Sequence, residues 1–279
     1  MESRRGPPEM SAREPQEQRV PGAGVEINVC QMGDPSKPPV FMIHGIYDEW
    51  ASWNLVYDAF LEHYRVIAVD LRGHGKSDKP QRGYESTDYA ADMAAVIRAL
   101  DVGPVAVVGH SLGAVTTGFL AADYPDLVKA VVLEDPPGRF DPKSGGRMTP
   151  MLDAKRLTEE ETYQFFKEMG PNLGEARWRD QTRRLRNTAD GPFEIILEWA
   201  ETGNAPDIVG AMSRIQCPAL LMQSDPDTGG VLPDHLAQEI VQGLSKGEFQ
   251  TFPGVGHNIH KDAPDDFARA AIAFLQKHA

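Results

Sequence analysis

A ten-residue stretch, Val105–Ala114, constrains the fold of this chain more than any other part of the sequence. Its first four residues are apolar and include three β-branched valines, which is typical of a short buried strand. It continues with a pentapeptide of the pattern G-x-S-x-G, Gly109-His110-Ser111-Leu112-Gly113. The residues that follow, 114–124, contain several alanines and predict a helix. A strand, a sharp turn and a helix in this order expose the side chain at the centre of the turn.

Ser111 is therefore the candidate nucleophile of this sequence. The turn is tight, so the residues two positions before and after Ser111 must lack bulk, and Gly109 and Gly113 meet that condition. The N-terminus of the predicted helix points at the same place and favours negative charge there. The pattern predicts chemistry in which Ser111 attacks a substrate and a nearby base removes its proton.

Composition excludes several classes of partner. The formal net charge of −13 argues against nucleic acid and against an anionic membrane surface. No apolar run approaches the roughly 20 residues of a membrane span. Cys30 and Cys217 are the two cysteines, lack metal-ligand spacing and predict free thiols in a cytoplasmic protein. We expect no metal and no organic cofactor, and the oligomeric state stays open.

Apolar strands alternate with helices along most of the chain, which predicts a largely parallel sheet with helices on both faces. Seven strands are expected, over residues 25–29, 39–43, 64–69, 105–108, 127–133, 217–222 and 249–252. Residues 138–213 break this rhythm and predict an inserted helical cap, with helices over 158–169, 174–185 and 193–201. The core of the domain is then formed by residues 21–137 and 214–279, and the polar segment 1–20 is expected to be a disordered arm.

His257 is the candidate base. It lies on a glycine-flanked loop after the last predicted strand, Gly254-Val255-Gly256-His257-Asn258, and it follows Ser111 as the order nucleophile, acid, histidine requires. Three other histidines are expected to lie on exposed helices or loops: His235, His260 and His278.

Three aspartates compete to be the acid that orients His257. Asp135 follows the strand after the nucleophile helix, whereas Asp225 and Asp227 follow the strand over 217–222. All three are expected at the carboxyl edge of the sheet, where α/β active sites assemble. The aspartates that are not the acid would cap loops.

Backbone N–H groups of Leu112 and Ile46 are the candidate donors of an oxyanion hole, because both residues follow strands that end at the same edge. His44 is expected to brace the Ile46 loop. Four further residues are candidates for contact with substrate: Gly45, Tyr47, Trp50 and His110. Trp50 and Trp53 could equally pack beneath the cap.

Four motifs in order resemble the α/β-hydrolase superfamily over residues 25–279: His44-Gly45, Asp70-Leu71-Arg72-Gly73-His74-Gly75-Lys76-Ser77, Gly109-His110-Ser111-Leu112-Gly113 and Gly256-His257. The resemblance implies an eight-stranded, mostly parallel sheet with a helical cap after strand six. In that family the acid normally follows strand seven, which favours Asp227. Some lactonases and dehalogenases carry it after strand six, which keeps Asp135 open. Similar epoxide hydrolases and dehalogenases use an aspartate nucleophile, so Ser111 argues against both activities.

The sequence thus predicts a serine hydrolase of a small carboxylic ester or lactone that works through an acyl-enzyme. One alternative is a hydrolase of C–C bonds in vinylogous diketone acids, which would need a basic group for the substrate carboxylate. The cap offers five arginines for that purpose: Arg177, Arg179, Arg183, Arg184 and Arg186. The other alternative is a ligand receptor of the same fold with little turnover.

Overall fold

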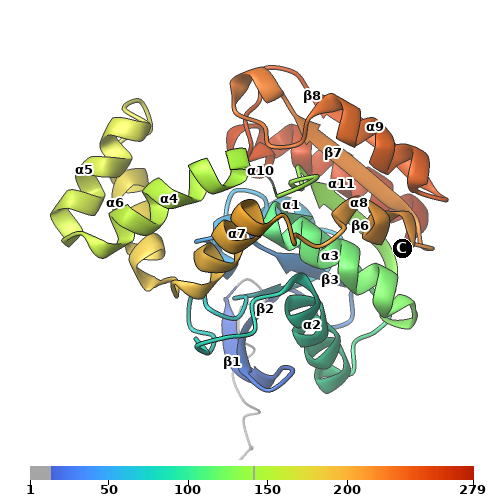
Figure 1. The fold of residues 1–279 in the computed structure, drawn as a ribbon. Coiled ribbons are helices and arrows are strands. Elements are labelled where there is room, and N and C mark those ends of the chain that lie inside the picture. Colours follow the sequence, from blue (N-terminus) through green and yellow to red (C-terminus); the bar gives the residue numbers. More distant parts are fainter. Residues whose placement is uncertain (1–13, 141) are drawn as a thin grey trace, which may run out of the picture.

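A single eight-stranded sheet forms the centre of the molecule (Figure 1). The computed structural model describes residues 14–140 and 142–279. The strand order is β1-β2-β4-β3-β5-β6-β7-β8, and β1 and β2 run antiparallel to their neighbours while all other pairs are parallel. The strands are β1 Gln16–Pro21, β2 Glu26–Met32, β3 Pro39–Ile43, β4 Arg65–Val69, β5 Val105–His110, β6 Val128–Glu134, β7 Ala219–Ser224 and β8 Gly247–Phe252. The expected fold class is confirmed.

Helices cover both faces of this sheet because its central strands are apolar on both sides. Along β3, Phe41 and Ile43 join the core under one layer of helices, and Val40 and Met42 join the core under the other layer. The first layer consists of α2 Ser86–Leu100, α3 Leu112–Asp123, α8 Ile208–Ser213 and α9 Asp234–Gly243. The second layer holds η1 Trp50–Trp53, α1 Tyr57–Leu61, α10 Ile259–Asp262 and α11 Pro264–His278. Two further 3₁₀ turns lie in loops, η2 Pro125–Leu127 and η3 Pro226–Thr228.

β1 is the strand that the hydrophobic pattern did not predict. Five of its six side chains are exposed and only Val20 is buried, so the strand shows no apolar alternation. Main-chain pairing with β2 holds it at the edge of the sheet. The expectation of a disordered arm over residues 1–20 is therefore wrong for residues 16–20, while residues 1–13 lie outside the described part of the chain.

The register of the parallel strands brings their carboxyl ends to one edge. Ile43 of β3 lies beside Gly109 of β5, and His110 of β5 lies beside Glu134 of β6. Glu134 in turn pairs with Met222 of β7. The loops that begin at His44, Ser111, Asp135 and Asp225 consequently start next to one another, although they are spread over most of the sequence.

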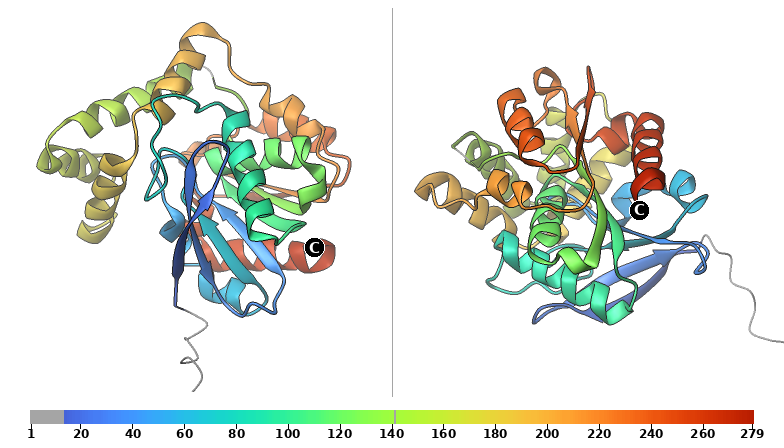
Figure 2. Two further views of the ribbon diagram at one scale, coloured as in Figure 1. Left: turned by 90° about the horizontal axis from the view of Figure 1, so that it is seen from below. Right: turned by 90° about the vertical axis from the view of Figure 1, so that its right-hand side faces the viewer.

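The described residues between β6 and β7 form five helices and no strand. They are α4 Pro142–Arg156, α5 Glu159–Met169, α6 Glu175–Asn187, α7 Gly191–Thr202 and α8. Figures 1 and 2 show α4, α5 and α6 extending to one side of the sheet, away from the helical layers. Together with α7, which we group with them as the cap, they share a small core that comprises Met151, Leu152, Ala154, Phe166, Leu185 and Phe193. α8 instead packs against α3 and α9, so it belongs to the core of the domain.

Within the described residues, no helix is both long and apolar enough to cross a membrane. Cys30 is buried, Cys217 is partly buried, and both are free thiols. Burial raises the pKa of Cys30 to about 12, so its thiol stays protonated at neutral pH.

Candidate active site

Ser111 stands at the junction of β5 and α3 in a strained conformation. Its φ of 53° and ψ of −115° lie outside the regions that side-chain-bearing residues ordinarily adopt. The backbone N–H of Ser111 donates to the carbonyl oxygen of Glu134 at 2.9 Å, which ties the turn to the end of β6. A Cβ on Gly109 would lie 2.3 Å from the carbonyl oxygen of Gly113, so the turn closes only without a side chain there.

His257 and Asp135 meet at this edge of the sheet. His257 Nδ1 and Asp135 Oδ2 are 2.7 Å apart, and the aspartate is fully buried. The same carboxylate accepts two backbone hydrogen bonds, from Val231 to Oδ2 at 3.0 Å and from Ser224 to Oδ1 at 3.3 Å. Three donors from separate segments therefore fix the carboxylate, and its bond to Nδ1 leaves the other ring nitrogen, Nε2, free to act as a base.

Asp227, the acid favoured by the family pattern, lies elsewhere. It sits in the exposed turn η3, where its backbone N–H donates to Asp225 Oδ1 at 2.9 Å. Asp225 also accepts from the backbone of Gly254 at 2.8 Å, and these two bonds lower the pKa of its carboxyl group. Asp225 thus fastens η3 to the loop that carries His257. Asp135, and neither of the other two aspartates, is the one bonded to His257.

The loop after β3 lies directly against Ser111. A Cβ on Gly45 would stand 3.3 Å from Ser111 Cβ and 2.7 Å from His110 Nδ1, so only glycine allows this approach. His44 braces the loop: its Nε2 accepts from the backbone of Leu71 at 3.0 Å, and its Nδ1 lies 2.7 Å from the carbonyl oxygen of Gly45. Leu112 opens α3, where the N–H groups of the first turn have no intrahelical acceptor. Ile46 follows Gly45 in the same loop, and the oxyanion role of the Ile46 and Leu112 N–H groups stays a prediction.

The predicted substrate contacts separate into two groups. Tyr47, at a positive φ of 47°, stacks on Phe193 of the cap with ring centroids 6.5 Å apart. Trp50 stacks on Tyr57, and Trp53 is fully buried against the His260 ring. The two tryptophans therefore pack in the helical layer around α1 and α11. Contact of Tyr47 with substrate stays a prediction.

His110 was predicted to contact substrate, but it is buried and supports the His257 loop. Its Nε2 donates to the carbonyl oxygen of His257 at 3.0 Å. Its ring lies between the rings of His257 and His260, with centroid distances of 4.6 and 4.8 Å. This contact joins the residue before the candidate nucleophile to the backbone of the candidate base.

The expectation that His260 is exposed is wrong. Its side chain is buried, and both its backbone N–H and its Nδ1 lie 2.9 Å from the carboxylate of Glu134. Burial raises the pKa of Glu134 and lowers that of His260. No hydrophobic period marks this pair, and the only sequence signal is that Glu134 directly precedes Asp135.

A second buried charged cluster, which the sequence did not indicate, joins the loop after β3 to α6 and α10. Asp48 forms ion pairs with Arg184 of α6 and with Lys261 of α10, the latter at 2.5 Å. All three residues are mostly buried. Burial and the neighbouring guanidinium groups of Arg184 and Arg177 lower the pKa of Lys261 to about 7.

Among the described residues, one group of side chains has the spacing of metal ligands: Asp48, His110 and His260. The ligand atoms lie within 4.8 Å of one another. Two cationic side chains, Arg184 and Lys261, already pair with the only carboxylate in the group, which disfavours a cation there.

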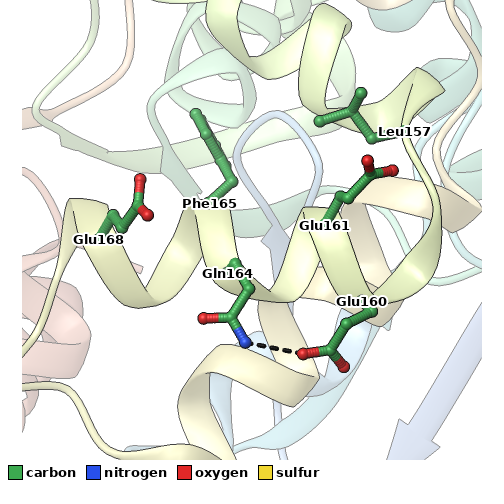
Figure 3. Close-up of a pocket in the computed structure, with 6 residues that line it drawn as sticks. All are labelled: Leu157, Glu160, Glu161, Gln164, Phe165 and Glu168. Carbon is green, nitrogen blue, oxygen red and sulfur yellow. Dashed lines mark hydrogen bonds between the residues drawn. The ribbon is translucent and has the colours of Figure 1, made fainter.

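The five arginines of α6 all have protein acceptors. Arg177 pairs with Asp262, Arg179 with Glu175, and Arg183 with Glu49 and Asp180. Arg186 donates to the carbonyl oxygen of Leu157. A surface pocket of about 300 Å³ on the outside of α5 (Figure 3) contains no candidate site residue and is lined by Leu157, Glu160, Glu161, Gln164, Phe165 and Glu168.

Known proteins resemble this chain over nearly its whole length. The chain is 44% identical to the 2-(acetamidomethylene)succinate hydrolase of Mesorhizobium japonicum, covering 92% of this chain and 94% of that protein. A crystal structure of E-2-(acetamidomethylene)succinate hydrolase superposes with a TM-score of 0.79 at 25% identity, over 94% of this chain and all of that one. The enol-lactonase of Burkholderia xenovorans LB400 shares the fold, with a TM-score of 0.76 at 19% identity over 93% of this chain and all of its own.

The family model described as "Alpha/beta hydrolase family" matches residues 40–270, which include every candidate residue of the site. This match, together with the sheet topology and the strand–turn–helix segment around Ser111, shows that the chain belongs to the alpha/beta hydrolase family.

Proposed function

We propose that this chain is a serine hydrolase in which Ser111 is the nucleophile, His257 the general base and Asp135 the acid. The observation that carries the proposal is the 2.7 Å contact between His257 Nδ1 and a buried carboxylate that three donors hold in place. A fixed carboxylate selects the tautomer with a proton on Nδ1 and stabilises the imidazolium that forms during reaction.

The reaction follows from these positions. His257 Nε2 takes the proton of the Ser111 hydroxyl while the oxygen attacks the substrate carbonyl carbon. The backbone N–H groups of Ile46 and Leu112 donate to the resulting oxyanion. The C–O or C–N bond of the leaving group then breaks, and the leaving group receives the proton from His257. A water molecule, deprotonated by the same histidine, releases the acid from the acyl-enzyme.

Small carboxylic esters and lactones are the first substrate class that we propose. They need neither a metal nor an organic cofactor in this mechanism, and the cytoplasm remains the proposed location. The C–C hydrolase alternative needs a free basic group, and each of the five arginines of α6 already pairs with a protein oxygen.

A second candidate comes from the 44% identical relative. The compound in its name is a succinate that carries an acetamidomethylene group, so it offers an amide carbonyl for Ser111 to attack. In that case the acyl-enzyme is an acetyl ester of Ser111, and the leaving group is an enamine of a dicarboxylic acid. We infer that small N-acetyl and O-acetyl compounds belong in the substrate screen beside the esters and lactones.

The test combines active-site labelling with that screen. A fluorophosphonate probe is expected to add one label per chain, and Ser111→Ala is expected to remove both the label and the turnover. The screen measures hydrolysis of nitrophenyl acetate, small lactones, a β-diketone acid and 2-(acetamidomethylene)succinate, each with Ser111→Ala as the blank. Labelling or turnover that persists in Ser111→Ala would contradict the proposal.

A further inference from the structure

We call residues 44–48, the loop after β3, the oxyanion loop. Asp48 holds this loop through its backbone N–H and through its carboxylate. The backbone N–H of Asp48 donates to the carbonyl oxygen of Gly45 at 3.3 Å, which closes a turn around Ile46 and Tyr47. Tyr47 has a φ of 47°, a conformation that costs free energy for any residue other than glycine and persists only where its surroundings enforce it. The position of the Ile46 N–H therefore depends on what fixes the end of this turn.

Two basic side chains from separate parts of the fold contact the Asp48 carboxylate. Arg184 reaches Asp48 from α6 of the cap, and Lys261 reaches it from α10, four residues after His257. The Arg184 side chain is 7% exposed and that of Asp48 is 6% exposed. Water screens a pair at this depth weakly, so its geometry is enforced far more firmly than that of a surface pair.

An exposed arginine of the cap offers a direct contrast. Arg156, at the end of α4, pairs with Asp190 at 3.3 Å and with Glu194 at 3.5 Å. The Arg156 side chain is 54% exposed, and the side chains of Asp190 and Glu194 are 35% and 58% exposed. Exposed pairs of this kind contribute little to stability or geometry.

We propose that Asp48 is a positioning residue that sets the oxyanion loop and links it to the cap through Arg184. When α6 is docked, Arg184 and Lys261 together hold Asp48, and the Ile46 N–H stays aimed at the oxyanion. When α6 moves away, Asp48 keeps one partner and the strained turn relaxes. This inference rests on the proposed function, and it adds that docking of the cap acts on the rate of the chemical step.

The experiment compares Arg184→Met with Arg156→Met on nitrophenyl acetate. This ester is neutral, so a cation has no substrate charge to bind. Arg184→Met is expected to lower kcat by about 10- to 100-fold with KM changed less than threefold, since a misplaced oxyanion donor acts on the transition state. Arg156→Met is expected to keep kcat within twofold of the unchanged protein.

Two further variants separate positioning from folding. Arg184→Lys keeps a cation that can reach Asp48 and is expected to restore part of the lost kcat. Asp48→Asn is expected to lose at least as much kcat as Arg184→Met, and melting temperatures identify any variant that does not fold. Arg184→Met and Lys261→Met keep the test decisive if Asp48→Asn fails to fold.

The outcomes distinguish this inference from the proposed function. Loss of activity in Ser111→Ala together with equal kcat in Arg156→Met and Arg184→Met would overturn the role of Asp48 and leave the serine mechanism intact. A rise in KM with unchanged kcat in Arg184→Met would also overturn it, because that pattern belongs to a residue that binds substrate. Persistent turnover in Ser111→Ala would instead contradict the serine mechanism itself.

Discussion

Four histidines of this chain are fully buried and share one electrostatic consequence. Burial lowers the pKa of His44, His74, His110 and His260, because a charged imidazolium loses its hydration in the interior. For His74 the value falls to about 4. All four rings are therefore neutral at pH 7, as the bond from the backbone of Leu71 to His44 Nε2 requires.

This neutrality predicts how the protein responds to acid. His74 has a folded pKa near 4, below the ordinary value of 6.5, so its contribution to stability is complete above pH 6.5 and is lost as the pH falls toward 4. At pH 5 the loss from this residue is about 2 kcal/mol. His74→Asn keeps a donor for the carbonyl oxygen of Arg72 and removes the titrating ring.

Urea unfolding at pH 7 and pH 5 measures the effect. The drop in unfolding free energy between the two pH values should be smaller in His74→Asn by about 2 kcal/mol. An equal drop in both proteins would show that His74 does not carry the acid sensitivity.

At the level of single residues, the sequence offered Ser111, His257 and two oxyanion positions as candidates, and it favoured Asp227 over Asp135, whereas His257 contacts Asp135. Asp135 and Asp227 both follow strand ends, so strand pattern places both at the same edge. The choice depends on backbone conformation: Asp135 adopts a φ of 41° and is buried, whereas Asp227 lies in an exposed 3₁₀ turn. Strand periodicity carries no information about either turn.

Among the elements, hydrophobic period predicted α5, α6 and α7 but missed α4 and β1. α4 contains two adjacent glycines and Pro150, which lower its helix propensity. Packing against α7 stabilises it as a helix. α5 begins at a capping box in which Thr158 and Glu161 exchange hydrogen bonds, so its start could be read from sequence. Tertiary contacts override local preference in α4, and pairing at the sheet edge does so in β1.

The cap helices are expected to open more readily than the sheet. The small core of the cap contains no strand residue, whereas β5 is buried along its whole length. Segments without such burial open at lower free energy. Amide hydrogen exchange followed by mass spectrometry should show faster exchange in α4 to α6 than in Val105–Val108. Equal protection in the two regions would contradict a separately opening cap.

On the scale of the whole molecule, the register of the parallel strands brings the parts of the candidate site together. Parallel pairing from β3 to β7 brings together loops that begin at residues 44, 111, 135 and 225. Each segment adds one component of the candidate site: the proposed oxyanion loop, the turn at Ser111, the Asp135 carboxylate, and the segment that fastens the His257 loop. The doubly covered sheet was predictable from alternating apolar strands, but the side-chain bonds across its edge depend on loops whose paths follow no periodic pattern.

The central claim is that Ser111, His257 and Asp135 act as one catalytic unit, and kcat of two aspartate variants tests it most directly. Asp135→Asn should lower kcat by about 10⁴-fold, since the amide cannot hold the required tautomer of His257 or stabilise its charge. Asp227→Asn changes an exposed turn and should stay within twofold of the unchanged protein, with equal melting temperatures confirming that both variants fold. A folded Asp135→Asn with full activity, or a folded Asp227→Asn without activity, would contradict the account.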